Sequence, residues 1–159
     1  FLGICLGMQM AVIEYARNVK KIRYANSTEI SEKCKDPVID LMTSQKEIIN
    51  MGGTMRLGAW DCELSKNTIA HKVYKKKLIS ERHRHRYEFN NKYLKKIFDD
   101  KFIIAGLNPD TKLVEIIENR DHPWFVGVQF HPEYKSSVYN PHPIFVNFVK
   151  ASLKKYLNK

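Results

Sequence analysis

The start of the chain carries the feature that most constrains its fold, an apolar run that ends in a cysteine between two glycines, FLGICLG. The run FLGI is typical of a short buried strand. Beyond it, apolar residues recur at helical spacing and predict a helix from about Gly7 to Lys20. Such a strand must turn sharply into the helix at Cys5, and glycines at positions 3 and 7 leave room for that turn.

Cys5 matches the pattern of a nucleophile elbow, G-x-nucleophile-x-G, in which a strand-to-helix turn presents a reactive side chain. The turn holds the sulfur clear of the backbone at the N-terminus of the helix. Backbone N–H groups there lower the pKa of a thiol and are available to stabilise an oxyanion. A buried structural cysteine is the alternative interpretation, and the short motif alone does not decide between the two.

A second candidate group lies near the other end of the sequence, in VQFHPEY. His131 directly follows a strand-like apolar run, and Glu133 lies two positions further on. A cysteine nucleophile needs a base, and the base needs a carboxylate that orients it. Cys5, His131 and Glu133 therefore form a candidate catalytic triad. An ordinary loop histidine and a solvated glutamate are the alternative interpretation of HPE taken alone.

The remaining segments predict an α/β fold. Strands are expected at 37–42, 101–107, 112–118 and 124–130, and another should begin after the glycine pair at 52–53 and continue through Trp60. Residues 61–77 are expected to combine a strand with a short helix. Helices are expected around 93–98 and from 144 onward. Residues 26–36 are expected to form a loop, and 44–50 are ambiguous. Buried strands mixed with amphipathic helices indicate an open, mostly parallel sheet flanked by helices, with an antiparallel hairpin across NPDTK. In such sheets, sites form at the carboxyl ends of strands, where Cys5 and His131 both lie.

Composition excludes several classes of protein. The apolar stretches fall short of the roughly 20 residues that a membrane span needs, and no signal-peptide pattern is present. Three cysteines without CxxC spacing argue against a disulfide framework or a zinc site and favour the cytoplasm. The net charge of +10 is compatible with an anionic partner, but the basic residues are scattered, which favours a solvated surface over a nucleic-acid site.

The segment ERHRHRY requires its own assessment. Alternation along a strand would place three arginines on one face and two histidines on the other: Arg82, Arg84 and Arg86, and His83 and His85. An exposed basic strand, a basic patch for RNA and a histidine metal pair are the possible interpretations. The metal interpretation lacks a third ligand nearby, so no metal site is expected. Arg56 in TMRLG is either structural or a contact for an activating nucleotide, and the sequence leaves this open.

Taken together, GICLGMQ and FHPE resemble the class I, triad-type glutamine amidotransferases. Across nearly the whole chain, the blocks CLGMQMAVIEYARN, ANSTE, PVIDLM, GGTMRLG, ERHRHRYEFN, LVEIIE and DHPWFVGVQFHPEY resemble the C-terminal glutaminase domain of the CTP synthase family. GGTMRLG and ERHRHRYE are specific to that family among amidotransferases. The resemblance implies a flavodoxin-like class I amidotransferase fold. It also implies that Cys5 attacks the side-chain amide of L-glutamine, that His131 moves the proton, and that a glutamyl thioester is hydrolysed to glutamate.

The resemblance further implies a glutamine pocket. The residues that follow the nucleophile would line it, with backbone donors at the helix start: Leu6, Gly7, Met8 and Gln9. Glu29 in NSTE would hold the substrate α-ammonium group, and a solvated loop acid is the alternative interpretation of this residue. Arg86 would pair with the α-carboxylate, for which a planar guanidinium is well suited.

In the full enzyme of this family, ATP phosphorylates UTP, and ammonia displaces the phosphate to give CTP. ATP, Mg²⁺, UTP and the activator GTP are therefore implied for the full enzyme, which assembles as a homotetramer, and no cofactor is expected within residues 1–159. Phe1 lies inside an apparent strand, so we expect a partial glutaminase domain, without the synthetase domain and the upstream glycine-rich oxyanion loop. Such a chain is expected to be a weak or inactive glutaminase by itself. The alternatives are another triad amidotransferase or a γ-glutamyl hydrolase, and a non-enzymatic basic RNA-binding module.

Overall fold

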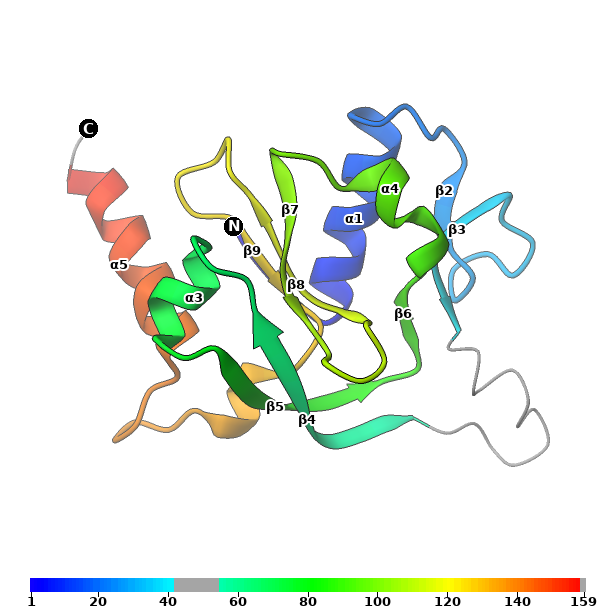
Figure 1. Cartoon of the computed structure of the whole chain (residues 1–159). Coiled ribbons are helices and arrows are strands. Elements are labelled where there is room, and N and C mark those ends of the chain that lie inside the picture. The colour runs from blue at the N-terminus through cyan, green and yellow to red at the C-terminus, as the bar shows by residue number, and fades with distance from the viewer. Residues whose placement is uncertain (42–54, 158–159) are drawn as a thin grey trace.

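The computed structural model of the protein describes residues 1–41 and 55–157 (Figure 1). Its strands are β1 (Leu2–Ile4), β2 (Ala25–Ser27), β3 (Asp36–Leu41), β4 (Arg56–Leu64), β5 (Leu78–His85), β6 (Tyr87–Phe89), β7 (Phe102–Leu107), β8 (Val114–Asn119) and β9 (Val126–Val128). Its helices are α1 (Leu6–Asn18), α3 (Ile69–Tyr74), α4 (Leu94–Ile97) and α5 (Pro143–Leu157), with 3-10 turns η1 (Asn91–Tyr93) and η2 (Pro132–Lys135).

The larger sheet contains six strands in the order β1-β9-β8-β7-β4-β5. The α/β class and the hairpin across NPDTK, β7–β8, agree with the sequence prediction. The expectation of a mostly parallel sheet is wrong for the described residues, because β1–β9 is parallel and the other neighbouring pairs are antiparallel. Short connections link β7 to β8 and β8 to β9, and a short connection joins antiparallel strands, whereas a parallel pair needs a long crossover.

The smaller sheet joins β2, β3 and β6 in that order. β2 runs parallel to β3, and β3 runs antiparallel to β6. The loop expected at 26–36 is therefore partly wrong, since its first residues belong to β2. Ala25 and Ser27 are fully buried beside β3, and this long-range pairing outweighs the polar local sequence.

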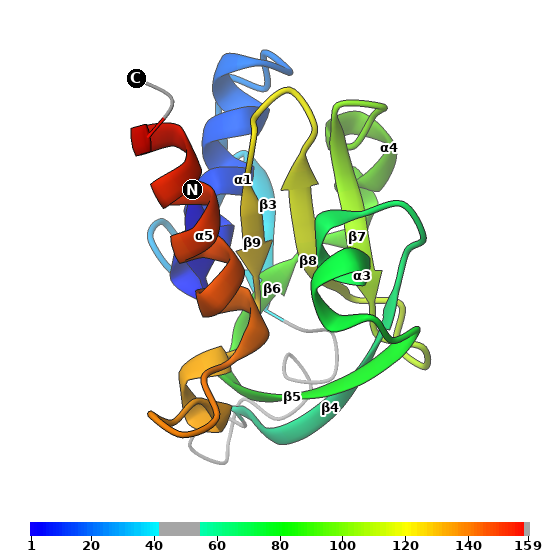
Figure 2. The same cartoon turned by 90° about the vertical axis from the view of Figure 1, so that its left-hand side faces the viewer.

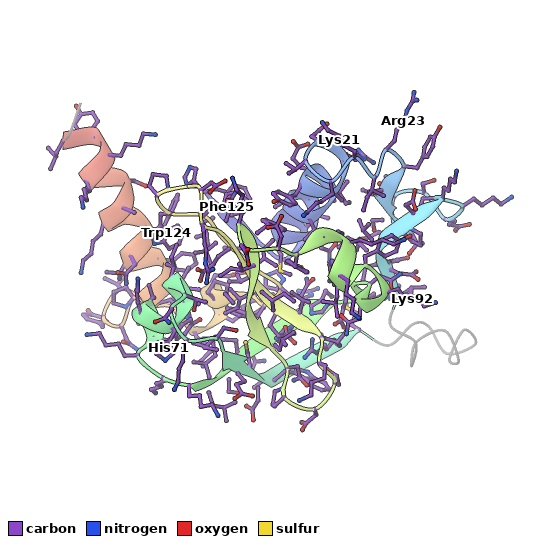
Figure 3. The ribbon with its side chains drawn as sticks, turned by 45° about the horizontal axis from the view of Figure 1, so that its top comes forward. Lys21, Arg23, His71, Lys92, Trp124 and Phe125 are labelled. Atoms are coloured by element: carbon purple, nitrogen blue, oxygen red, sulfur yellow. The ribbon has the colours of Figure 1, made fainter. Side chains whose placement is uncertain are left out.

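Helices cover both faces of the larger sheet (Figure 2). The core on one face contains α1 and α4 together with the smaller sheet, and the core on the other face contains α3 and α5. Neighbouring residues at the entry to β9 divide between these cores (Figure 3). Trp124 packs against Phe148 of α5 with ring centroids 5.4 Å apart, and Phe125 stacks on Phe1 at 4.3 Å. β9 is thus buried from both sides, as its continuous apolar sequence predicts.

The helices after β6 differ from expectation in detail. Asn90 caps η1 by accepting a hydrogen bond from the Lys92 N–H, but α4 spans only Leu94–Ile97. The predicted C-terminal helix is present as α5, and its apolar stripe is buried at Ile144 while Tyr156 is 75% exposed. In the described part of the chain, none of the helices has the length and apolar character that crossing a membrane requires. The ambiguous segment 44–50 and the glycine pair at 52–53 lie outside the described residues.

Basic side chains project from separate parts of the surface. Lys21 and Arg23 project beyond the end of α1, and Lys92 projects from η1 (Figure 3). This distribution favours the interpretation of the positive charge as a solvated surface.

Candidate active site

Cys5 occupies the turn between β1 and α1 with φ 50° and ψ −105°, a backbone conformation that residues with a side chain rarely adopt. Its N–H donates to the Val128 carbonyl at the end of β9, with N···O 2.7 Å. A Cβ atom on Gly3 would lie 2.8 Å from the carbonyl carbon of Gly7, whereas a Cβ atom on Gly7 would meet nothing within 4 Å. The elbow is therefore present, and close packing requires glycine at position 3 rather than at position 7.

His131 lies just past the end of β9, at the sheet edge that also carries Cys5. Its Nδ1 atom is 2.5 Å from Oε1 of Glu133, and its backbone N–H donates to the Arg82 carbonyl of β5 at 2.8 Å. Within residues 1–41 and 55–157, the buried Nε2 atom has no hydrogen-bond partner. A carboxylate at Nδ1 favours the tautomer in which Nε2 accepts a proton. The Glu133 carboxylate also acts on Cys5, because its charge raises the pKa of the thiol.

Cys5 opens into a pocket of about 360 Å³. Its lining residues come from the elbow and α1, from the segment after β2, from the residue before β4, and from the end of β5 through the start of β6: Cys5, Leu6, Gln9, Glu29, Met55, Arg84, His85, Arg86 and Tyr87. Glu29 and Arg86, predicted at opposite ends of one substrate, both border this cavity. An acid and a guanidinium on one cavity with a thiol can bind the two charged groups of an α-amino acid.

Two of the predicted pocket residues do not line the cavity. Met8 is fully buried in the core beneath α1, and Gly7 borders a separate groove. The helix accounts for this difference, because successive residues point in directions about 100° apart. Leu6 and Gln9 are three positions apart, so their side chains share the face that the pocket occupies.

The environment of Cys5 does not by itself produce a thiolate. Burial is the largest influence and raises the pKa of the thiol, and the charges of Glu29 and Glu133 raise it further. Two donors act in the opposite direction, the Leu6 N–H and the side-chain amide of Gln129, whose Nε2 lies 3.7 Å from Sγ. The expected effect of the helix start is therefore present but outweighed by burial. A thiol with a raised pKa needs a base to become a nucleophile.

A buried polar cluster adjoins the pocket, which we call the Arg56 network. It contains five residues from four strands: Arg56, His83, His85, Glu88 and Glu115. Arg56 Nη2 lies 2.7 Å from Oε1 of Glu115, and Nη1 lies 3.4 Å from Oε2 of Glu88. The two imidazoles contact each other, with His83 Nδ1 2.8 Å from His85 Nε2.

Burial controls the charges in the Arg56 network. It lowers the pKa of His83 to about 2 and that of His85 to about 3, so both rings are neutral near pH 7. It raises the pKa of Glu88 to about 8 and that of Glu115 to about 7, while Arg56 acts in the opposite direction. The burial of Arg56 indicates a structural role for this residue. The sequence had left open whether Arg56 is structural or contacts a nucleotide. The described residues contain no group of three or more histidine, cysteine or acidic side chains that could hold a metal ion.

Sequence reasoning did not identify some residues at this site. Alternation in ERHRHRY separated the arginines from the histidines correctly, as the burial of β5 confirms. That pattern did not reveal that Arg84 and His85 both reach the pocket. Gln129 was not identified, although it lies within VQFHPEY, since its contact with Cys5 joins positions far apart in the chain.

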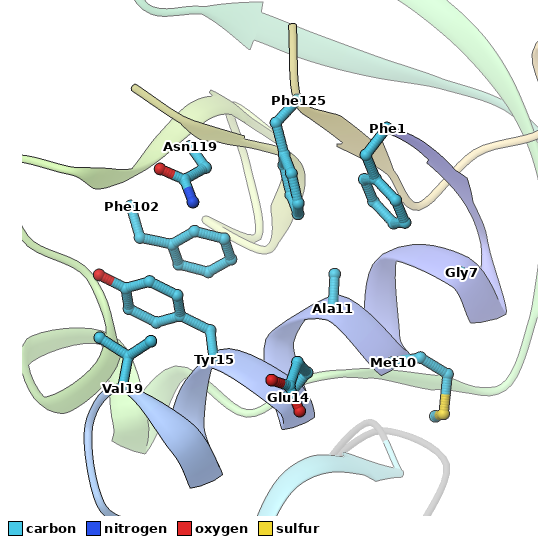
Figure 4. A pocket seen from close by; sticks show the side chains of 10 residues that line it. All are labelled: Phe1, Gly7, Met10, Ala11, Glu14, Tyr15, Val19, Phe102, Asn119 and Phe125. Carbon is cyan, nitrogen blue, oxygen red and sulfur yellow. The ribbon is translucent and has the colours of Figure 1, made fainter. Parts of the chain in front are cut away.

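A second hollow lies along α1 (Figure 4). It has a volume of about 540 Å³ and is bordered by the aromatic rings of Phe1, Tyr15, Phe102 and Phe125. Among its described lining residues are Glu14 and Asn119 but no cysteine or histidine. Its described lining therefore offers no thiol nucleophile, unlike the cavity at Cys5. Elsewhere in the fold, Cys34 and Cys62 are free thiols, as is Cys5.

Comparisons with known proteins identify relatives of the chain. The family Glutamine amidotransferase class-I matches residues 1–151. A CTP synthase of Christiangramia forsetii is 65% identical over 152 residues, and one of Clostridium beijerinckii is 58% identical over 159 residues. The alignments cover 96% and 100% of this chain but 28% and 30% of the two relatives, so the chain spans less than a third of their length.

Two solved structures also resemble the chain. The glutaminase domain of Trypanosoma brucei CTPS with bound acivicin has a TM-score of 0.89 and 37% identity, over 96% of this chain and 60% of that chain. A GMP synthase subunit of Thermoplasma acidophilum has a TM-score of 0.60 and 18% identity, over 99% of this chain and 60% of that chain. The second likeness concerns the fold alone.

Proposed function

The chain belongs to the class-I glutamine amidotransferase family, and on this premise we propose that it hydrolyses the side-chain amide of L-glutamine to glutamate and ammonia. The observation that carries the proposal is the position of Cys5 in a strained elbow beside the strand end that bears the His131–Glu133 pair. Glu29 and Arg86 on the same cavity support an amino acid as the substrate.

In the first half of the reaction, the Nε2 atom of His131 takes the proton of Cys5, and the sulfur attacks the amide carbon. The Leu6 N–H, a donor to the sulfur in the resting protein, is available to the oxyanion that forms. When the C–N bond breaks, the proton held by His131 passes to the departing nitrogen. Neutral ammonia leaves, and a γ-glutamyl thioester remains on Cys5.

In the second half, water attacks the thioester carbon. His131 takes a proton from the water and returns it to the sulfur as the C–S bond breaks, which releases glutamate and restores the thiol. Glu133 accepts the hydrogen bond from the Nδ1–H of His131 throughout, so that Nε2 faces the reacting atoms in both steps.

The test is glutamate release by the full-length protein and by its Cys5→Ala variant, with labelling by a glutamine-like diazoketone followed by mass spectrometry. We expect Cys5→Ala to lose both activity and label, because the variant has no nucleophile. Cys34→Ser, which removes a free thiol elsewhere, should keep both. Activity that survives in Cys5→Ala, or label found on Cys34, would contradict the proposal.

We further propose that the full-length protein is a CTP synthase, in which the ammonia aminates UTP at the expense of ATP. The relatives named CTP synthase that share 65% and 58% identity with this chain support this assignment. ATP, Mg²⁺ and UTP then bind in a synthetase domain that completes the protein, GTP activates the glutaminase step, and the enzyme assembles as a homotetramer. The three free cysteines favour the reducing cytoplasm as its location.

An assay of the full-length protein separates this function from that of other triad amidotransferases. We expect CTP to form from UTP only when ATP and a nitrogen source are present, and GTP to accelerate glutamate release. Glutamate release without CTP formation and without a response to GTP would assign the chain to a different amidotransferase.

The 159-residue chain alone is expected to be a weak glutaminase. Within the described residues, Leu6 is the one backbone donor found at the sulfur, and loss of a second oxyanion donor typically costs about 10²–10³ in rate. Glutamate release should therefore be far slower from the 159-residue chain than from the full-length protein at equal concentration. Equal rates would show that the donor set within residues 1–159 is sufficient.

A further inference from the structure

We propose that Gln129 is a further catalytic residue, whose side-chain amide donates a hydrogen bond to Cys5 Sγ and stabilises the attacking thiolate, and that Gln9 is the positioning residue that fixes this amide. The inference deepens the proposed amide hydrolysis and rests on it for its role in turnover. Gln129 is fully buried, two positions before His131, and its Nε2 lies 3.7 Å from the sulfur. The segment that carries the base therefore also carries a donor to the nucleophile.

The orientation of the Gln129 amide follows from its neighbours. The Nε2 group of Gln9 donates to the Tyr87 carbonyl at 2.8 Å, and a carbonyl can only accept, so this end of Gln9 must be the nitrogen. The same Nε2 group lies 3.3 Å from Oε1 of Gln129. With its oxygen held by Gln9, Gln129 presents its nitrogen to Cys5. A reversed Gln129 would place two donors together and an oxygen against the sulfur.

Burial makes this contact consequential. Gln9 is 2% exposed and Gln129 is fully buried, so neither amide can exchange its partner for bulk water. The sulfur also lies within the fields of Glu29 and Glu133, both of which oppose a negative charge on it. A hydrogen bond to a charged group is roughly twice as strong as one between neutral groups. The Gln129 donor thus acts chiefly on the thiolate, the state in which Cys5 attacks.

The experiment measures the pH dependence of Cys5 alkylation by iodoacetamide in the full-length protein, with the Cys5 peptide followed by mass spectrometry. Gln129→Met keeps the length of the side chain and removes the donor, and Gln9→Met releases the Gln129 amide. Asn108→Leu, which removes a buried amide that donates to the Asp61 carbonyl, is the matched control. Glutamine turnover of each variant is measured in parallel, with folding checked by circular dichroism.

We expect the alkylation midpoint to rise by about 0.5–1 pH unit in Gln129→Met, by less in Gln9→Met, and not in Asn108→Leu. For glutamine hydrolysis we expect kcat of Gln129→Met to fall about 10–100-fold, with KM changed less than about threefold, because the amide touches the sulfur and not the substrate. A folded Gln129→Met variant with an unmoved midpoint would overturn the proposal, since a purely structural glutamine would affect stability alone.

A second measurement covers the case in which Gln129→Met does not fold. In the wild-type protein with ¹⁵N-labelled glutamine, the Gln129 side-chain amide resonance should shift with the same pH midpoint as Cys5 alkylation. That shift should vanish in Cys5→Ala. If the Gln129 amide resonance does not shift as Cys5 titrates, the inference is overturned. If the wild-type protein lacks glutaminase activity while the alkylation midpoint still moves, the proposed function fails and the hydrogen bond to the thiolate stands.

Discussion

His131 and Glu133 form a hydrogen-bonded pair but differ in their access to water. The side chain of His131 is 19% exposed, and that of Glu133 is 46% exposed. A contact this open contributes little to the free energy of folding, because water competes for both partners. The same contact can still fix which imidazole nitrogen carries the proton. Its effect should therefore appear in turnover rather than in stability.

Replacement of Glu133 by glutamine tests this separation. The variant keeps the size of the side chain but no longer stabilises the imidazolium that forms when His131 takes the thiol proton. We expect kcat/KM for glutamine to fall by about 10–10³-fold, with the melting temperature almost unchanged. Glu63→Gln, which alters a similarly exposed carboxylate paired with Lys77, is the matched control and should keep full activity. A loss smaller than about twofold in Glu133→Gln would remove Glu133 from the triad.

Arg86 allows a second test at single-residue resolution. Arg86→Lys keeps the positive charge but loses the planar fork that pairs with a carboxylate. We expect KM for glutamine to rise by at least about tenfold while kcat changes little, because the contact is present in the ground state and the transition state alike. Arg82→Lys alters an exposed arginine of β5 that does not line the pocket, and steady-state kinetics should show no change. Equal effects from both substitutions would argue against a substrate contact at Arg86.

The junction of β1 and α1 is the element on which the candidate site depends, and its two glycines have different roles. Gly3→Ala would place Cβ 2.8 Å from the Gly7 carbonyl carbon, so we expect a loss of about 1–3 kcal/mol in the free energy of unfolding. Gly7→Ala enters open space on a helix, where alanine is favoured, so stability should stay the same or rise by up to about 1 kcal/mol. Urea unfolding of both variants measures the difference. Equal losses would mean that the elbow needs glycine at both positions.

The elements that local pattern predicted well are those whose cause is local. Three such features depend only on residues close together in the sequence, and the structure contains all of them: the elbow at Cys5, the amphipathic repeat of α1 and the alternation of β5. β2 was not predicted, because Ala25–Ser27 become a strand only through pairing with β3. The antiparallel majority of the larger sheet was missed for a related reason. Apolar runs indicate buried strands but carry no information about strand direction.

The candidate site divides in the same way. The motifs around Cys5 and His131 indicated both residues, since each motif marks a strand end. Met8 was placed in the pocket because it follows the nucleophile, but helical rotation turns it into the core. Gln129 and the pairing of Arg56 with Glu88 and Glu115 depend on contacts between distant segments. Such contacts require the assembled fold and leave no pattern in a single sequence.

At the scale of the whole molecule, the Arg56 network joins the two sheets. Glu88 belongs to β6 of the smaller sheet, while Arg56, His83 and Glu115 belong to β4, β5 and β8 of the larger one. His85 is part of this network and also lines the pocket. Two buried acids share one guanidinium, and burial makes their ionisation oppose folding. The Arg56 network should therefore make the stability of the protein depend on pH. The same network contributes His85 to the lining of the pocket at Cys5.

The direction of that dependence follows from the pKa values. Glu88 and Glu115 have folded pKa values of about 8 and about 7, above the ordinary 4.5, so folding takes up protons and stability falls as pH rises across that range. His83 and His85, with folded pKa values of about 2 and about 3, act oppositely and add stability as pH rises toward their ordinary 6.5. Between about pH 4.5 and 6.5 the two effects offset each other, and above about pH 6.5 the carboxyl groups act alone.

Glu88→Gln isolates the carboxyl contribution, because the amide keeps an oxygen for Arg56 and cannot ionise. We expect the wild-type protein to lose free energy of unfolding between about pH 6.5 and 8.5, and Glu88→Gln to lose about 1–2 kcal/mol less over the same interval. Urea unfolding at several pH values measures both slopes. Glu63→Gln, which removes an exposed carboxyl group whose pKa is lowered by Lys77, should reproduce the wild-type slope. If Glu88→Gln also follows the wild-type slope, Glu88 is ionised in the folded protein, and Arg56 outweighs the burial of its partner.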